Sequence, residues 1–219
     1  MEPYFELGPY TRSITTKSAE AETWFNRGLN WCYAFHHKEA IRCFYKTIEL
    51  DPSCVMGYWG VAYATGPYYN IPWEKMSPSG RPEAIRICYE YSQKAKKLRE
   101  NTPLSEVEKA LCDALTIRFQ ATKADEIEEL KKWDDDYADA MRLVYRDFSH
   151  DYDVCALTAE ALVVRTPWQL WDLKNRTPAE GTFTEEAIAI VEKALGRIEE
   201  EKHTPHAGLL HFYIHIMEM

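Results

Sequence analysis

The sequence predicts an all-α protein, an array of about nine helices that pair into hairpins. Apolar residues recur with three-to-four spacing along most of the 219 residues, and no segment is a convincing strand. The clearest example is residues 24–52, two short amphipathic helices joined by a tight bend and ended by Asp51-Pro52. A composition of 46% hydrophobic and 28% charged residues, with 9 glycines and 11 prolines, is typical of a globular chain with a sizeable core.

Start and stop signals divide the chain into an extended leader, residues 1–18, and a helical array, residues 19–219. Thr102-Pro103 is a cap followed by proline at the first helical position, and Thr182 to Glu185 has the spacing of a capping box. Thr204-Pro205 opens the last helix. We expect helices at about 19–35, 38–50, 54–64, 83–100, 103–120, 124–148, 153–164, 183–201 and 205–219.

The first two helices carry the spacing of a known repeat. Its large, small, aromatic and terminating positions are filled by Trp24, Gly28, Trp31, Ala40, Phe44 and Pro52. Gly28 and Ala40 are small because the two helices cross closely there. The chain therefore resembles the tetratricopeptide repeat (TPR) superfamily, with its best repeat at residues 21–54. The resemblance implies a right-handed α-α superhelix of helical hairpins, in which the later helices are degenerate repeats.

An insertion at residues 66–82 interrupts the second repeat, since its four prolines and two glycines cannot continue a helix. It carries Tyr68, Tyr69 and Trp73, which is unlike a solvated linker. We expect this segment to fold back onto the array, either as a functional loop or as a plug that covers an exposed helix face.

Charge and cysteine content limit the possible partners. The net charge of −9, from 26 basic and 35 acidic residues, argues against a nucleic-acid or anionic-membrane partner. No apolar run approaches membrane-spanning length, and the N-terminus lacks the features of a signal peptide. The six cysteines form no CxxC pair, which favours free thiols in a reducing compartment. We therefore expect a cytoplasmic protein.

The last helix carries the main chemical motif. His211, His215 and Glu218 stand at i, i+4 and i+7, which places them on one helix face. Two imidazoles and a carboxylate are a ligand set for zinc or non-haem iron, with coordination positions left open. The metalloprotease signature H-E-x-x-H is absent, because Phe212 follows His211. The alternative is structural: a buried histidine that hydrogen-bonds a neighbouring tyrosine or carbonyl and needs no metal.

Other polar residues have simpler interpretations. Glu160 lies in an apolar run, so it is either paired internally or functional. The acidic run 134–136 points in several directions from one helix, which predicts a solvated surface. His150, His203 and His206 lie in connections beside Asp or Pro and are interpreted as surface residues.

Several motifs together resemble a subgroup of long bacterial and fungal TPR-like proteins. They are residues 35–42 (FHHKEAIR), 58–62 (YWGVA), 66–70 (GPYYN), 137–141 (YADAM), 159–162 (AEAL) with Pro167-Trp168, and 211–215 (HFYIH) with Glu218. The subgroup usually has Asn where this chain has His36, so the resemblance favours His37 as the functional histidine of that pair. It also implies that the array continues beyond residue 219 in a longer parent protein.

Two functions follow from these observations. The first is a scaffold that binds a protein or peptide partner through an apolar aromatic groove lined by Phe25, Leu29 and Tyr33. The second is a metal-dependent enzyme or a metal- or small-molecule-binding protein, holding a divalent transition metal (Zn, Fe or Cu). Its metal ligands are His37, His211, His215 and Glu218, its candidate acid/base groups Glu39 and Glu160, and its lid Tyr68, Tyr69 and Trp73. Whether the protein is an enzyme, and its oligomeric state, stay open.

Overall fold

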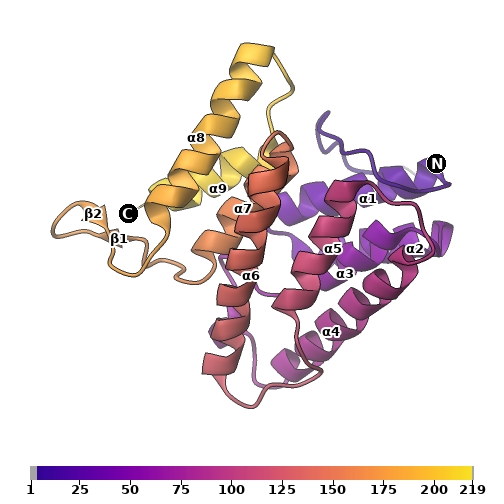
Figure 1. Ribbon diagram of the computed structural model, residues 1–219, viewed down its shortest axis with the longest axis horizontal. Coiled ribbons are helices and arrows are strands. Elements are labelled where there is room, and N and C mark those ends of the chain that lie inside the picture. The colour runs from indigo at the N-terminus through magenta and orange to yellow at the C-terminus, as the bar shows by residue number, and fades with distance from the viewer. Residues whose placement is uncertain (1–3, 219) are drawn as a thin grey trace.

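The computed structural model describes residues 4–218, and this part of the chain is all-α, as predicted (Figure 1). Its nine α-helices are α1 (Ala19–Tyr33), α2 (His37–Leu50), α3 (Val55–Thr65), α4 (Gly80–Arg99), α5 (Glu106–Arg118), α6 (Ile127–Phe148), α7 (Tyr152–Val163), α8 (Thr184–Glu201) and α9 (Ala207–Met217). A 3₁₀ turn, η1 (Trp73–Lys75), and two short strands, β1 (Trp171–Asp172) and β2 (Thr177–Pro178), complete it. The first three residues of the predicted leader and the last residue of the predicted final helix, Met219, lie outside the described range.

α4 starts three residues earlier than predicted, within the last residues of the expected insertion, and α6 starts three residues later. The caps of three further helices differ from the prediction. The start of α5 is fixed by Ser105, which forms a reciprocal capping box with Glu108, rather than by Thr102. Thr182 does not cap α8, because its hydroxyl donates to the carbonyl of Ala179 instead. The cap of α9 is the imidazole of His206, which accepts from the backbone N–H of Leu209 at 3.1 Å.

The strands were not predicted from the sequence. β1 and β2 pair antiparallel, with Trp171 opposite Pro178 and Asp172 opposite Thr177. The Asp172 carboxylate accepts from the backbone N–H groups of Lys174 and Asn175, which closes the turn between the strands. Two residues per strand show no alternation that a sequence pattern could reveal.

The first hairpin packs for the reason its spacing suggests. A Cβ atom on Gly28 would lie 2.6 Å from the ring of Phe44, and one on Gly60 of α3 would lie 2.4 Å from the same ring. Both helices can approach Phe44 only because these positions lack a side chain. The close crossing predicted at Gly28 is confirmed, and Phe44 is the residue that fills it.

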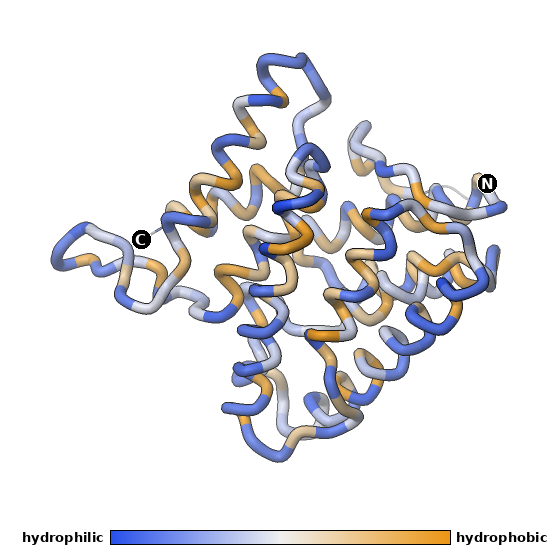
Figure 2. Tube along the Cα trace, in the orientation of Figure 1, coloured by the Kyte–Doolittle hydropathy of each residue, from blue (hydrophilic) through white to orange (hydrophobic). Residues whose placement is uncertain are grey.

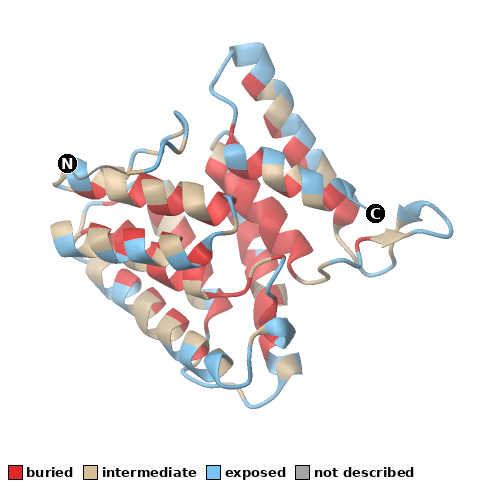
Figure 3. Ribbon diagram, turned by 180° about the vertical axis from the view of Figure 1, so that it is seen from behind, coloured by how far each residue is buried: buried red, intermediate tan, exposed pale blue. Residues whose placement is uncertain are grey.

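The core runs through the middle of the array. Every residue of α7 from Asp153 to Val163 is buried, and this helix lies among the others in Figure 3. Hydrophilic residues gather at the far end of α8 and in the loop between β1 and β2 (Figure 2). The hairpin projects beside α8 at one side of the molecule (Figure 1).

The last described helix packs onto the first. α9 contacts α1 as well as α7 and α8. A Cβ atom on Gly208 would lie 2.6 Å from the ring of Tyr33, so α9 rests directly on that side chain. Phe25, Leu29 and Tyr33 are consequently at most 1% exposed. The expectation that they line an open groove is wrong, because α9 and the neighbouring helices enclose the face on which they lie.

The insertion packs against the array, as expected. Tyr69 and Trp73 are buried, and Trp73 meets the ring of Phe119 edge-on at 6.4 Å. The backbone carbonyl of Pro67 accepts from the guanidinium of Arg118 at 2.9 Å. Trp73 therefore belongs to the core and is not part of a lid, whereas Tyr68 stays partly exposed.

Candidate functional site

Two imidazoles meet edge to edge on α9. His211 and His215 lie one helical turn apart on the same face, and their Nε2 atoms are 3.1 Å apart. Both side chains are partly buried, and that of His215 keeps 15% of its surface exposed. Part of the His215 side chain therefore lies at the surface of the molecule.

Both Nδ1 atoms are already paired with oxygen. His211 Nδ1 donates to the backbone carbonyl of Tyr33 at 2.6 Å, and His215 Nδ1 donates to the carboxylate of Glu218 at 2.7 Å. Carbonyl and ionised carboxylate oxygens only accept, so each imidazole carries its proton on Nδ1. In the neutral rings the two Nε2 lone pairs then face each other. At 3.1 Å they repel unless a proton or a metal cation lies between them.

The separation of the Nε2 atoms suits a shared metal ion. Zinc–nitrogen bonds of about 2.0–2.1 Å place two ligand nitrogens about 3.4 Å apart at a tetrahedral angle and about 2.9 Å apart at a right angle. The observed 3.1 Å lies between these values. Metal-binding histidines also characteristically donate their other N–H to a carbonyl or a carboxylate, as both members of this pair do. The pair thus has the distance and the tautomers that two ligands of one ion require.

Phe35 forms the wall beside the pair. Its ring stacks on His215 with centroids 5.1 Å apart and planes 16° apart, and it lies 4.3 Å from the ring of His211. Phe35 has φ 57°, the left-handed region that usually requires glycine at a helix C-terminus. Its N–H donates to Cys32, and the next N–H donates to Trp31, the pattern of a Schellman motif. A bulky residue here costs about 1–2 kcal/mol, which the contacts of its ring offset.

Two cavities flank the imidazole pair. One, of about 410 Å³, is lined by Tyr69, Trp168, Leu170, Trp171, Leu173 and Glu218. The other, of about 340 Å³, is bounded by Phe35 and lies over the bend between α1 and α2. Tyr69 connects the first cavity to the pair, since its ring lies 5.0 Å from that of His215.

His37 is close to the pair but does not join it. Its ring stacks on Tyr68 at 3.8 Å, its Nδ1 donates to the carbonyl of Ala64 at 2.8 Å, and Phe35 lies next to it on the side of α9. Burial lowers the pKa of His37 to about 4, so the ring is neutral. His37 is a packed core histidine in this structure rather than a third ligand.

Glu218 supports the pair from the far side. The prediction placed it on the His211 face by continuing the helix, but α9 ends at Met217 and the backbone of Glu218 is extended. Its carboxylate therefore reaches Nδ1 of His215 instead of the Nε2 atoms. Within residues 4–218 no group of three or more His, Cys, Asp or Glu side chains is arranged to hold a metal ion. The four predicted ligands are thus two imidazoles, one supporting carboxylate and one separate histidine.

The two candidate acid/base groups have other partners. Glu39 accepts from Tyr4 and from Arg42 on the outer side of α2. Glu160 is buried on α7, where it accepts from the hydroxyl of Tyr63 at 2.7 Å. Burial raises the pKa of Glu160. Of the two interpretations offered by the sequence, internal pairing is the one that the contacts of Glu160 satisfy.

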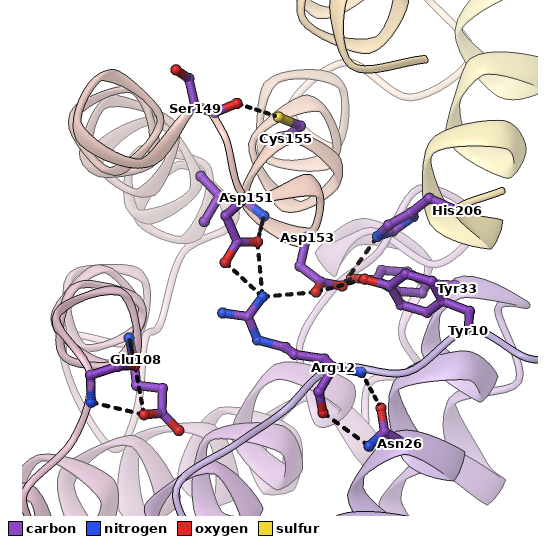
Figure 4. A network of polar contacts seen from close by, with 12 residues as sticks. Tyr10, Arg12, Asn26, Tyr33, Glu108, Ser149, Asp151, Asp153, Cys155 and His206 are labelled. Carbon is purple, nitrogen blue, oxygen red and sulfur yellow. Dashed lines mark hydrogen bonds and ion pairs between the residues drawn. The ribbon is translucent and has the colours of Figure 1, made fainter. Parts of the chain in front are cut away.

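Sequence reasoning missed a buried network around Asp153 (Figure 4). This carboxylate accepts from Tyr33, from Tyr10 at 2.7 Å, from Arg12 at 2.8 Å and from His206 at 3.2 Å. His206 is fully buried, so its interpretation as a surface residue is wrong. The signal available was the Asp151/Asp153 pair at a helix start, which could have suggested a site for the arginine of the leader.

A second buried ion pair was also missed. Arg118 is fully buried and its Nε donates to Asp134 at 3.2 Å. Asp134 is therefore not part of a solvated face, although Asp136 bonds to Lys132 on the surface. An arginine beside Phe119, at the end of an amphipathic helix, was the only local hint of this pair.

Comparison of the chain with protein-family models, with curated proteins and with solved structures found no match. In residues 4–218 no helix is both long and apolar enough to cross a membrane. The relationship to tetratricopeptide proteins and the right-handed superhelix stay predictions.

Proposed function

We propose that the chain binds a divalent transition-metal ion, zinc or copper(II), through the Nε2 atoms of His211 and His215. The observation that carries this proposal is the 3.1 Å approach of two Nε2 atoms whose Nδ1 protons are both committed to oxygen acceptors. A cation between them converts a repulsive contact into two coordinate bonds. Imidazole nitrogen suits both metals, and copper(II) binds most tightly in the usual order of divalent ions.

The protein supplies two ligands, so the remaining coordination positions are open to water or to a small molecule. Such an ion acts as a Lewis acid and can activate bound water. Phe35 and Tyr69 keep one side of the pair apolar. Glu218 holds the ring of His215 in position and strengthens it as a ligand. A substrate of such an ion would lie in the larger cavity, of about 410 Å³, which Tyr69 connects to the pair.

The test is metal titration of protein purified without a histidine tag, by isothermal calorimetry with Zn²⁺ and by electron paramagnetic resonance with Cu²⁺. We expect one ion per chain, with affinity reduced at least about tenfold in His211→Ala and in His215→Ala. The matched control is His203→Ala, which removes a surface imidazole and should leave the affinity unchanged. Equal affinity in the wild type and in His211→Ala would overturn the proposal.

A scaffold function is the second candidate, because α9 exposes an apolar stripe. Leu210, Ile214 and Met217 are all exposed at helical spacing. Such a stripe is complementary to the apolar face of another amphipathic helix. Peptides selected by phage display on the wild-type protein should lose binding to Ile214→Asp. If the selected peptides bind both proteins equally, this surface is not the docking site.

A cytoplasmic location is also proposed. All six cysteines are free and buried, which suits a reducing compartment. Fractionation of the source cells would test it, and recovery in an oxidising compartment would contradict it.

A further inference from the structure

The 410 Å³ cavity beside α9 has an unusual lining. Three of its six residues are aromatic, namely Tyr69, Trp168 and Trp171, and two are leucines. The single charged residue is Glu218, and no lysine or arginine lines the cavity. The volume lies within the range of small-molecule sites.

Hydrogen bonds within the protein fix two of the three aromatic side chains, Tyr69 and Trp171. Trp171 Nε1 donates to the backbone carbonyl of Ile216 at 2.7 Å. The Tyr69 hydroxyl accepts from the backbone N–H of Trp168 at 3.1 Å. The polar atoms of both side chains are therefore already used within the protein. The rings of Tyr69 and Trp168 stand at 65° with centroids 5.9 Å apart, so they form two walls of a corner.

The chemistry of this lining favours a cation. Aromatic faces carry negative electrostatic potential and attract ammonium groups, with tryptophan the most effective. Within the chain, Lys75 already places its Nζ 5.8 Å from the centre of the Trp168 ring. The Glu218 carboxylate accepts one hydrogen bond from His215 and keeps 46% of its side-chain surface exposed, so a cation in the cavity can pair with its charge.

We propose that this cavity is a binding site for an alkylated ammonium ligand, such as a trimethylammonium compound. The cationic head would lie against Trp168 and Tyr69 with Glu218 as its counter-ion. The cavity is larger than a trimethylammonium group, so the natural ligand carries a further apolar part that reaches Leu170 and Leu173. Glu218 also bonds to His215 of the imidazole pair, but the aromatic walls belong to the cavity and are in place without a metal ion.

The test is titration with choline and with its neutral isostere 3,3-dimethylbutan-1-ol. Binding is measured by tryptophan fluorescence and by nuclear magnetic resonance, and a chelator is present to keep the imidazole pair free of metal. We expect choline to bind at least about fivefold more tightly than the isostere. Affinity for choline should fall in the order wild type, Trp168→Phe, Trp168→Leu, with a total loss of about 3- to 30-fold. Trp168 is half exposed, so these substitutions leave the fold intact.

Two controls separate this site from the others. Tyr45→Leu removes an exposed aromatic residue on α2 and should not change choline affinity. His211→Ala should abolish the proposed metal site and leave choline binding unchanged, so the two proposals can fail independently. Equal binding of choline and the isostere, or equal affinity of the Phe and Leu variants of Trp168, would overturn the ammonium site.

Discussion

The guanidinium of Arg12 lies 2.8 Å from the carboxylate of Asp153, which joins residues 141 positions apart in the chain. The same carboxylate accepts from Tyr10, Tyr33 and His206 (Figure 4). Four donors saturate its two oxygens, and together they hold the pKa of Asp153 well below its usual range against the effect of burial. This one side chain therefore fastens the leader, α1 and the start of α9 to α7.

Arg12→Ala should destabilise the fold by about 3–5 kcal/mol, because it leaves a buried carboxylate without its cation. The free energy of unfolding in urea, followed by circular dichroism, measures the effect. Arg146→Ala is the matched control, since Arg146 pairs with Asp147 on the surface, and should change stability by less than about 1 kcal/mol. Similar decreases in the free energy of unfolding in the two variants would show that the buried Asp153 network stabilises the fold no more than a surface ion pair does.

His37 should make stability depend on pH. Its pKa is about 4 in the folded chain and about 6.5 when unfolded, so only the unfolded state takes up a proton between these values. The contribution of His37 to the free energy of unfolding is constant above about pH 6.5. Below that value it falls with pH, and at pH 4 it has lowered the stability by about 3 kcal/mol. Urea unfolding at pH 7, 6, 5 and 4 measures this effect. As pH falls, the free energy of unfolding should decrease less in His37→Gln than in the wild type. His150→Gln, at an exposed position, should follow the wild type, and a parallel curve for His37→Gln would contradict this prediction.

Two glycine-to-alanine substitutions should have opposite effects. Gly208→Ala puts a Cβ atom 2.6 Å from the ring of Tyr33, which should cost about 1–3 kcal/mol and loosen α9 from α1. In Gly196→Ala the new Cβ meets nothing within 4 Å in the middle of α8, so higher helix propensity should stabilise the fold by about 0.5–1 kcal/mol. Thermal unfolding distinguishes them. Equal stability of the two variants would mean that α9 does not rest on Tyr33 in solution.

Glu218→Gln tests the support of the imidazole pair. The amide oxygen can still accept from His215 Nδ1, but the negative charge that strengthens the ring as a ligand is lost. Zinc affinity should therefore fall by about tenfold. Glu192→Gln is the control, because Glu192 bonds Tyr213 on another face of α9. An unchanged affinity in Glu218→Gln would remove this carboxylate from the site.

The positions of the helices could be predicted because their signals are local. The Gly28 crossing follows from residues within one hairpin, and the i, i+4 spacing of His211 and His215 is enough to bring their rings together. Helix ends depend on tertiary contacts as well as on local residue types. Thr102 and Thr182 carry the right residue types, but Ser105 and the tertiary contacts of α8 decide where those helices begin.

The rest of the site depends on contacts between distant segments. No local pattern indicates that Phe35 adopts a left-handed conformation, since glycine is the residue that normally signals it. The burial of His206 and of Tyr33 arises only when α9 docks on α1 and α7. Glu218 was assigned to the wrong side of the pair because the sequence does not reveal that α9 ends one residue before it.

The packing of α9 on α1 also bears on how the chain unfolds. In an open repeat array each unit contacts only its neighbours, so stability is a sum over units and the ends can fray first. Here the first and last described helices share an interface, and loss of either removes support from the other. Hydrogen exchange should therefore report similar opening free energies for α1 and α9, as in a single cooperative unit.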